Sequence, residues 1–233
     1  MYKKITHTIV EEHFDHPAAS QIKAKLDKKR SRIPTTETFN SDAFKTEVND
    51  YFRNYLNKLH TMTASMSGTD EDFITAFESI YQDVDKLGNL IKHFYSSEFG
   101  ERLNSIFRGI PILLGLMIHG SKAGTDTKNL VNRLNNAATD LANVLVAYDN
   151  SWLPQPTTEM TTGFVSSLVS EVRARQSKDM PTVTKSVEQA ISRFTDLGKL
   201  MGEKIVAQFP SRFTSSVLPT PSPTPMKYDS SIM

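Results

Sequence analysis

Hydrophobic residues recur every three or four positions through most of the chain, which is the spacing of one face of an α-helix. Six such stripes span residues 44–66, 73–94, 99–117, 130–145, 160–172 and 183–205, and no alternating run of comparable length favours a β-strand. The pattern predicts an all-α fold, a bundle of about six long amphipathic helices. The first stripe is Phe44, Val48, Tyr51, Tyr55, Leu59, Met62 and Met66, and the last is Val183, Val187, Ile191, Phe194, Leu197, Met201 and Ile205.

Several residues mark where these helices should start or break. Ser41 or Asp42 is expected to cap the first helix, and Asp179 with Pro181 suits the cap and first turn of the last. Pro111 lies inside the third stripe and has no amide hydrogen. We therefore expect Pro111 to kink the third helix or to restart it.

A faint repeat connects the second, fourth and sixth helices. Each contains a leucine followed by a small residue, and the three leucines are separated by 54 and 56 residues. The repeat predicts three helical hairpins, because one hairpin cannot bury its own stripe and a small residue lets a neighbouring helix approach closely. Chance similarity among leucine-rich helices is the alternative. The pairs are Leu87-Gly88, Leu141-Ala142 and Leu197-Gly198.

Composition divides the chain into a body and two ends. Its 233 residues fit one domain with appendages, or two small domains. Residues 1–40 hold eight Lys or Arg against five Asp or Glu and are expected to form an arm with a short basic helix near 17–29. Residues 41–213 form the predicted helical bundle domain. Residues 214–233 are rich in Pro, Ser and Thr, which predicts a flexible tail that favours extended polyproline geometry.

Charge and residue usage exclude several classes of protein. A formal net charge of +1 provides no global field to hold a polyanion. Without cysteine there is no disulfide, thiol nucleophile or Cys-ligated metal. The longest apolar run, residues 110–118, is shorter than the roughly 20 residues of a spanning helix, and polar residues interrupt any N-terminal signal core. We therefore expect an intracellular, soluble protein without membrane insertion.

The densest set of possible metal ligands lies in the arm. His7, Glu12, His13, Asp15 and His16 could surround a cation if this segment were helical, since His13 and His16 would then be about one turn apart. The set does not match the His-Glu-x-x-His pattern of a zinc helix. A solvated or partner-facing arm is the preferred interpretation, and no cofactor is expected.

Three further features have simple structural interpretations. Residues 115–122 resemble a phosphate loop with its last two residues exchanged, but they end an apolar helix and favour a glycine helix stop. Trp152, in a loop at 149–156, is expected to lock that loop onto the core, with aromatic docking as the alternative. Asp83 and Asp85 are expected on an exposed face, without the apolar pocket that acid–base chemistry needs.

Two groups of cationic or titratable residues are possible binding or catalytic sites. A run of four basic residues could contact a phosphate backbone or act as a nuclear-import signal, but such runs are common on solvated helix ends. Three histidines are scattered at helix ends and form no triad. The basic residues are Lys28, Lys29, Arg30 and Arg32, and the histidines are His60, His93 and His119.

Four segments carry a family resemblance. Residues 90–95 read Leu-Ile-Lys-His-Phe-Tyr, 99–103 read Phe-Gly-Glu-Arg-Leu, 152–154 read Trp-Leu-Pro, and 205–213 read Ile-Val-Ala-Gln-Phe-Pro-Ser-Arg-Phe. Together they resemble an uncharacterised all-helical family of bacilli and related bacteria, with members in large DNA viruses of amoebae and a terminal Ile-x-x-Gln-Phe-Pro-x-x-Phe motif. The resemblance covers about residues 50–213 and implies a helical fold with no known activity.

This chain differs from the family pattern at two sites and adds a segment at each end. The family's third and fifth helices carry an inward-facing histidine, whereas residues 108–110 read Arg-Gly-Ile and residues 166–168 read Ser-Ser-Leu here. A ligand or metal role for those histidines is therefore not expected in this chain. The basic arm and the Pro-Thr-Ser tail are similar to features of a viral member.

The sequence thus predicts a non-enzymatic helical scaffold or interaction protein. Its arm and tail would bind a protein partner or a second copy of the chain, in a virion or the host cytoplasm if the chain is viral. No nucleophile with a partnered base supports an enzyme. The alternative is a small-ligand or metal-binding helical bundle, because such sites form from facing side chains that sequence patterns barely reveal.

Alanine substitution of the three repeat leucines tests the predicted arrangement. If Leu87, Leu141 and Leu197 are core residues, each Leu→Ala change lowers the free energy of unfolding by about 2–5 kcal/mol through lost burial and the cavity left behind. Denaturant unfolding followed by circular dichroism measures the change. A value near zero would place that leucine on the surface.

Overall fold

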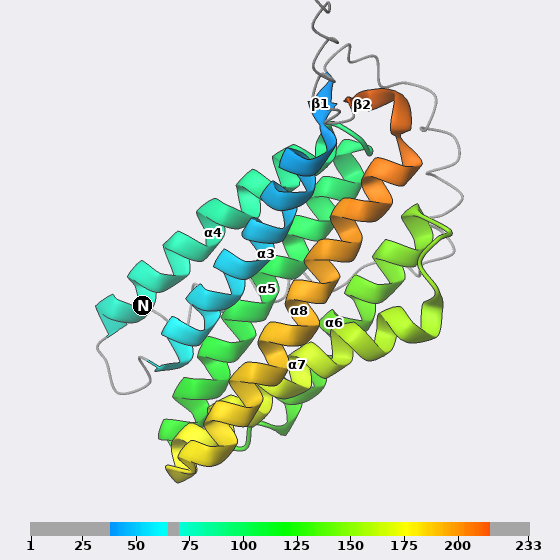
Figure 1. The fold of residues 1–233 in the computed structure, drawn as a ribbon. Helices are drawn as coiled ribbons and strands as arrows, with labels where there is room; N and C mark the ends of the chain where they lie inside the picture. The colour runs from blue at the N-terminus through cyan, green and yellow to red at the C-terminus, as the bar shows by residue number, and fades with distance from the viewer. Residues whose placement is uncertain (1–37, 65–69, 215–233) are drawn as a thin grey trace, which may run out of the picture.

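The structure is a computed structural model that describes residues 38–64 and 70–214 (Figure 1). Its helices are α3 (Ser41–Ala64), α4 (Asp70–Lys92), α5 (Ser97–Lys122), α6 (Lys128–Tyr148), α7 (Pro154–Ser177) and α8 (Met180–Gln208). The two-residue strands β1 (Phe39–Asn40) and β2 (Phe213–Thr214) and the 3₁₀ helix η2 (Pro210–Arg212) complete it. The predicted all-α multi-helix bundle is confirmed.

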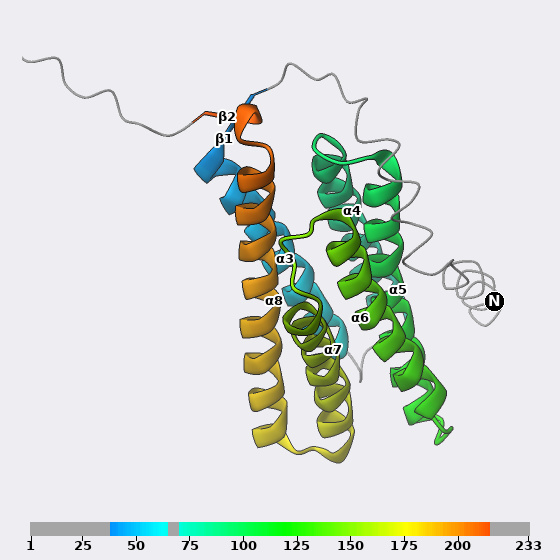
Figure 2. The same cartoon turned by 90° about the vertical axis from the view of Figure 1, so that its right-hand side faces the viewer.

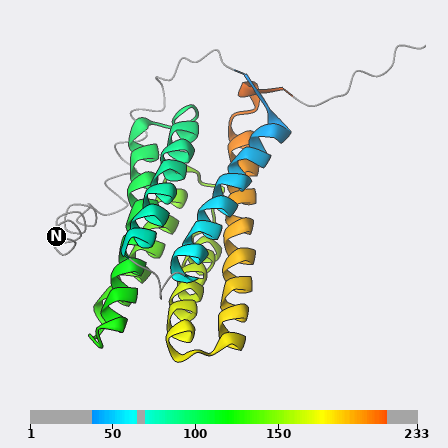
Figure 3. The ribbon, with the colours of Figure 1, turned by 90° about the vertical axis from the view of Figure 1, so that its left-hand side faces the viewer.

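Each helix packs against the next in the sequence, and successive helices run in opposite directions (Figure 2). The predicted hairpin partners therefore lie together. α8 packs almost as extensively against α3 as against α7, so the last helix lies beside the first (Figure 3). Contacts between hairpins are similar in extent to contacts within them, and the helices form one closed ring around a shared core.

Glycines let two pairs of helices approach closely, as the repeat predicted. At Gly198 on α8, an added Cβ would lie 2.8 Å from the Cβ of Phe52 on α3. At Gly88 on α4, an added Cβ would overlap the side chain of Asn104 on α5. Side chains of neighbouring helices fill the space that a larger residue would need. The repeat leucines Leu87, Leu141 and Leu197 are all buried.

The start of α3 differs from the prediction. Asn40 caps this helix, because its Oδ1 accepts hydrogen bonds from the backbone amides of Asp42 at 3.1 Å and Ala43 at 2.9 Å. The expected caps Ser41 and Asp42 lie inside the helix instead. The last residue of β1 is therefore also the cap of the first helix, which ties the strand to the bundle.

The start of α8 agrees with the prediction. Asp179 accepts hydrogen bonds from the backbone amide of Thr182 at 3.2 Å and from its hydroxyl at 2.6 Å. These bonds lower the pKa of Asp179. Pro181 occupies the first turn, where its missing amide hydrogen is not needed for a helical hydrogen bond.

Pro111 does not restart a helix, because α5 runs through it without interruption. A proline here leaves the carbonyl of Phe107, four residues earlier, without its helical amide donor. The buried hydroxyl of Tyr55 on α3 donates to that carbonyl oxygen at 2.8 Å. Burial raises the pKa of Tyr55 well above its usual value, so the hydroxyl keeps its proton. A side chain of α3 thus replaces the missing hydrogen bond of α5.

The predicted stripes are mostly buried, and α8 and α3 each show an informative difference. Ile191 on α8 was expected inside but is 41% exposed, and Ala190 is buried instead. On α3, Tyr51 is half-buried while Phe52 is fully buried. Phe52 packs at Gly198, so the close contact between these helices sets which of two neighbouring apolar positions faces inward.

Trp152 locks the loop before α7 onto the bundle, as predicted. Its indole is 5% exposed, and the ammonium of Lys204 on α8 lies 5.1 Å from the ring centroid. The same ammonium donates to the carbonyl oxygen of Ser151 at 2.8 Å. The loop is therefore fixed from two sides, although the next residue, Leu153, is 65% exposed.

In the part of the chain that the structure describes, only α5 is long and apolar enough to cross a membrane by length and composition. The apolar run at 110–118 belongs to this longer helix. The most apolar window of α5 is 72% buried by neighbouring helices. Such burial is typical of the core helix of a soluble bundle.

The hydrogen bond from Tyr55 predicts a coupled response to mutation. Tyr55→Phe leaves the buried carbonyl of Phe107 without a donor and is expected to lower the free energy of unfolding by about 1–3 kcal/mol. In a Pro111→Ala background, the new amide can donate to that carbonyl, so Tyr55→Phe should cost less. Urea unfolding of the four chains in this double-mutant cycle measures the coupling. Equal costs in both backgrounds would contradict the assignment.

Candidate functional site

Two predicted sites lie outside the described residues. They are the possible metal ligands His7, Glu12, His13, Asp15 and His16, and the basic cluster Lys28, Lys29, Arg30 and Arg32. The arm helix near 17–29 and the tail beyond Thr214 also lie outside them. Candidate sites within the described residues therefore come from the bundle and its ends.

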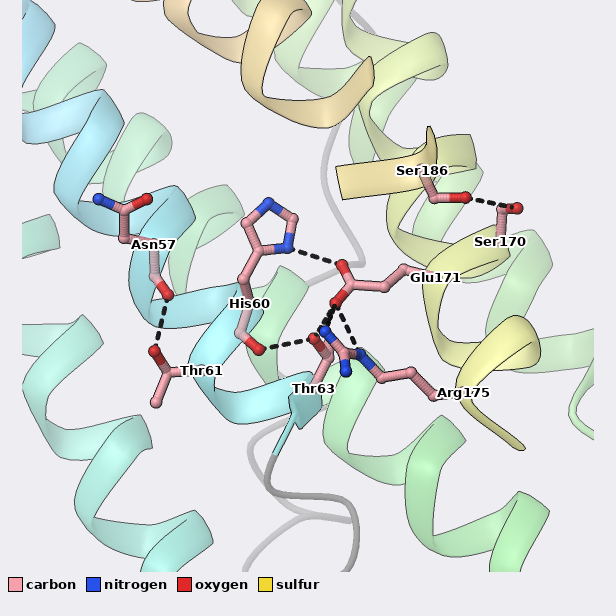
Figure 4. A network of polar contacts seen from close by, with 8 residues as sticks. All are labelled: Asn57, His60, Thr61, Thr63, Ser170, Glu171, Arg175 and Ser186. Atoms are coloured by element: carbon pink, nitrogen blue, oxygen red, sulfur yellow. Dashed lines mark hydrogen bonds and ion pairs between the residues drawn. The ribbon is translucent and has the colours of Figure 1, made fainter. Parts of the chain in front are cut away.

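The most deeply buried charged group among the described residues is Glu171 on α7, which has no exposed surface. Its carboxylate accepts hydrogen bonds from His60 Nδ1 and from the Thr63 hydroxyl, both at 2.6 Å (Figure 4). Arg175, one turn further along α7, donates through Nε at 2.9 Å. We call these four residues the Glu171 cluster. It joins the last turns of α3 to α7.

The hydrogen bonds of the cluster keep Glu171 ionised. Burial alone would raise the pKa of Glu171, but hydrogen bonds from His60 and Thr63, with a smaller contribution from Arg175, lower it below its usual value. An ionised carboxylate can only accept hydrogen bonds, so Nδ1 of His60 carries the proton in this pair. The cluster therefore fixes the orientation of the imidazole.

An oriented imidazole can serve as a metal ligand or as a general base. The Nε2 atom of His60 is buried and has no hydrogen-bond partner among the described residues. Among the described residues, no hydroxyl group lies within hydrogen-bond distance of Nε2, where it could act as a nucleophile. The described ranges also hold no group of three His, Cys, Asp or Glu residues that could bind a metal ion. What the geometry supports is a polar contact that links two helices.

Sequence reasoning placed His60 at a helix end and missed its partner. The two residues lie 111 positions apart, so no local pattern connects them. The sequence reveals only how the residues are spaced within each helix. His60 and Thr63 are three residues apart and Glu171 and Arg175 are four apart, which places each pair on one helix face.

The paired carboxylates of α4 form interhelical ion pairs. Asp83 lies 2.5 Å from the ammonium of Lys58 on α3, and its side chain is only 12% exposed. Asp85 pairs with Arg108 on α5. The expected exposed face is therefore wrong for Asp83, because α3 covers it. Both carboxylates connect neighbouring helices.

An open groove of about 410 Å³ lies where α6, α7 and the start of α8 meet. Hydroxyl, amide, carboxylate and guanidinium groups line it, together with short apolar side chains. The hydroxyl of Ser170 already accepts a hydrogen bond from Ser186 at 2.9 Å. The groove is a polar surface that a small ligand could enter. Its lining is Val131, Asn135, Ser166, Val169, Ser170, Arg173, Ala174, Ser177, Asp179 and Thr182.

The two ends of the described chain meet at one pole of the bundle. β1 and β2 pair in parallel, with Phe39 opposite Phe213 and Asn40 opposite Thr214. The ring of Phe213 stacks on that of Phe94 in the turn after α4, with centroids 5.2 Å apart and planes at 5°. We call this arrangement the terminal clasp. Its aromatic residues are Phe39, Phe44, Phe94, Phe209 and Phe213.

The terminal motif of the predicted family supplies much of the clasp. The carbonyl oxygen of the Gln208 side chain accepts a hydrogen bond from the Tyr95 hydroxyl at 2.5 Å. The guanidinium of Arg212 lies 5.4 Å from the ring centroid of Phe94 and donates to the backbone carbonyl of His93 at 3.2 Å. These contacts hold the end of α8 and η2 against the turn that follows α4. The motif therefore has a structural role here.

No protein-family model, curated protein or solved structure matches this chain. The resemblance to the bacterial and viral family stays a prediction that rests on the residues quoted above.

The Glu171 cluster predicts a pH-dependent contribution to stability. Glu171→Gln removes the buried anion that three donors share and is expected to lower the free energy of unfolding by about 3–5 kcal/mol at pH 7. The folded-state pKa of Glu171 is depressed, so its contribution is complete above the unfolded value of about 4.3 and is lost as the pH falls through the folded value. Urea unfolding of both chains at about pH 7, 5 and 3 measures this.

Glu159, an exposed glutamate on the same helix, provides the matched control. Glu159→Gln should change the free energy of unfolding by less than about 0.5 kcal/mol at every pH. A Glu171→Gln effect as small as this, or one that grows as the pH falls, would contradict the role of the cluster.

Proposed function

We propose that this chain is a non-enzymatic interaction protein. The helical bundle is a scaffold, and residues 1–37 and 215–233 bind the partner. The observation that supports this is the parallel pairing of β1 with β2, because both segments continue from the same strand pair. The clasp thus presents two compositionally distinct segments from one pole.

Two binding segments that leave the bundle close together bind a shared partner more tightly than either segment alone. Paired strands lie about 4.8 Å apart, so the segments start close together. Once one segment has bound a partner, the other faces it at a high effective concentration, and the combined affinity exceeds that of either alone. A rigid clasp favours this tighter binding, because it fixes the distance between the points where the two segments leave the strand pair.

The two segments have different chemistry. The arm offers the cations at 28–32, which suit an acidic surface, and the tail offers alternating prolines at 219–225, which suit an aromatic-lined groove. A protein partner with both features fits this pair of segments, and self-association is the second form of the proposal. A virion or host-cytoplasm location would follow from a viral origin.

A small-ligand function is the second candidate. The groove between α6, α7 and α8 has a volume of about 410 Å³, within the range of ligand pockets. Its hydroxyls and the guanidinium of Arg173 would suit a small polar molecule. Native mass spectrometry of the purified chain tests this, and a mass that always equals that of the bare polypeptide would count against it.

Deleting the two segments tests the interaction function. Chains lacking residues 1–37 or 215–233 should keep the helical signal and the unfolding midpoint of the full chain, because the clasp remains. Each should lose crosslinks to the partner in crosslinking mass spectrometry, or sediment as a smaller species if the partner is a second copy. Unchanged crosslinks and sedimentation in both deletions would contradict the proposal.

A slightly longer deletion is the matched control. Removing residues 1–40 also removes the Phe39 ring of the clasp and the Asn40 cap of α3. This chain should unfold with a free energy lower by about 2 kcal/mol or more, whereas the chain lacking 1–37 should not. Equal stability of the two chains would show that β1 does not hold the ends.

A further inference from the structure

Some polar groups in the groove between α6, α7 and α8 already have hydrogen-bond partners. Where α7 gives way to α8, the hydroxyl of Ser177 donates to the backbone carbonyl of Arg173 at 3.2 Å. The carboxylate of Asp179 accepts hydrogen bonds from the amide and the hydroxyl of Thr182. These three side chains, Ser177, Asp179 and Thr182, therefore make their main hydrogen bonds inside the protein.

Four other residues of the groove keep hydrogen-bond donors free. The side chains of Asn135, Ser166 and Arg173 make no hydrogen bond or ion pair with any residue that the structure describes. Ser170 accepts a hydrogen bond from Ser186, so its own hydroxyl proton remains available (Figure 4). The free groups are a guanidinium, an amide and two hydroxyls, and all of them can donate.

The spacing of these donors places them on the same surface. Ser166, Ser170 and Arg173 stand four and three residues apart on α7, which puts them on one face of the helix. Asn135 reaches the same groove from α6. Val169 also lines the groove and is almost fully buried, so an apolar surface adjoins the donors. Donors from two helices therefore converge on one concave surface.

The charges of the groove favour an anionic ligand. The hydrogen bonds from Thr182 lower the pKa of Asp179, so this carboxylate is ionised. It caps α8, and the partial positive charge at the start of that helix offsets its negative charge. The guanidinium of Arg173 has no comparable partner among the described residues. The charge left to attract a ligand is therefore positive.

We propose that this groove binds a small organic molecule through a carboxylate or phosphate group. A guanidinium holds such an oxyanion with two parallel hydrogen bonds, and Arg173 has this role. The hydroxyls of Ser166 and Ser170 and the amide of Asn135 donate to the remaining oxygens. The groove volume of about 410 Å³ is in the range of pockets for organic ligands. This assignment of a ligand class rests on the small-ligand function, the second candidate above.

Three probes with the same carbon skeleton test the proposal: glycerol phosphate, glycerate and glycerol. Each is titrated into the isotope-labelled full chain at constant ionic strength, and the backbone amide signals are followed by nuclear magnetic resonance. Constant ionic strength removes the general effect of salt on exposed charges. At least one of the two anions should cause saturable shifts at Ser166, Ser170 and Arg173, and glycerol should cause none. The anion that binds more tightly identifies the preferred group.

Variants at two arginines show whether the guanidinium binds the anion. Arg173→Gln should raise the dissociation constant of the bound anion by about tenfold or more, because it removes charge-assisted hydrogen bonds. Arg173→Lys keeps the charge but loses the planar pair of donors, so its affinity should be intermediate. Arg53, an exposed arginine on α3, provides the matched control. Arg53→Gln should leave the dissociation constant unchanged.

The proposal is overturned if neither anion shifts the groove residues, or if glycerol shifts them as strongly as the anions do. Equal loss of binding in Arg173→Gln and Arg53→Gln would also overturn it. If the anions fail while native mass spectrometry finds a neutral ligand on the purified chain, the small-ligand function stands and the oxyanion assignment fails. The deletion experiment concerns the interaction function, and its result does not affect that of the titration.

Discussion

The contact between α3 and α8 is the constraint on which the rest of the structure depends. It joins the first and last helices of the described chain and closes the ring. The close approach at Gly198 brings α8 onto Phe52, and the same contact carries β1 to β2 at one pole. Both the core and the terminal clasp follow from the backbones lying close enough for aromatic side chains to interlock.

Buried polar groups in this bundle act between helices. Tyr55 of α3 supplies the hydrogen bond that Pro111 removes from α5, and Glu171 of α7 collects donors from the end of α3. A buried polar atom without a partner is costly, so each of these contacts favours one alignment of its helices over shifted alternatives. Glu171 itself has no exposed surface. Its environment stabilises the ionised carboxylate and keeps water away.

The function proposed here follows from where the chain ends lie. The clasp brings β1 and β2, from which the arm and the tail continue in the sequence, to one pole of the bundle. Under the proposed function, the arm and the tail bind one partner together, and each strengthens the binding of the other.

The sequence by itself determined the helices, most inward residues, the role of Trp152 and the close approach at Gly88 and Gly198, because these follow from local periodicity and residue size. Only the tertiary structure decided that Ala190 rather than Ile191 faces inward, that His60 meets Glu171, and that Phe39 pairs with Phe213. His60 and Glu171, like Phe39 and Phe213, lie more than a hundred residues apart, and their contact depends on which helices become neighbours. Helical spacing does not encode that choice, which the packing of the whole core makes.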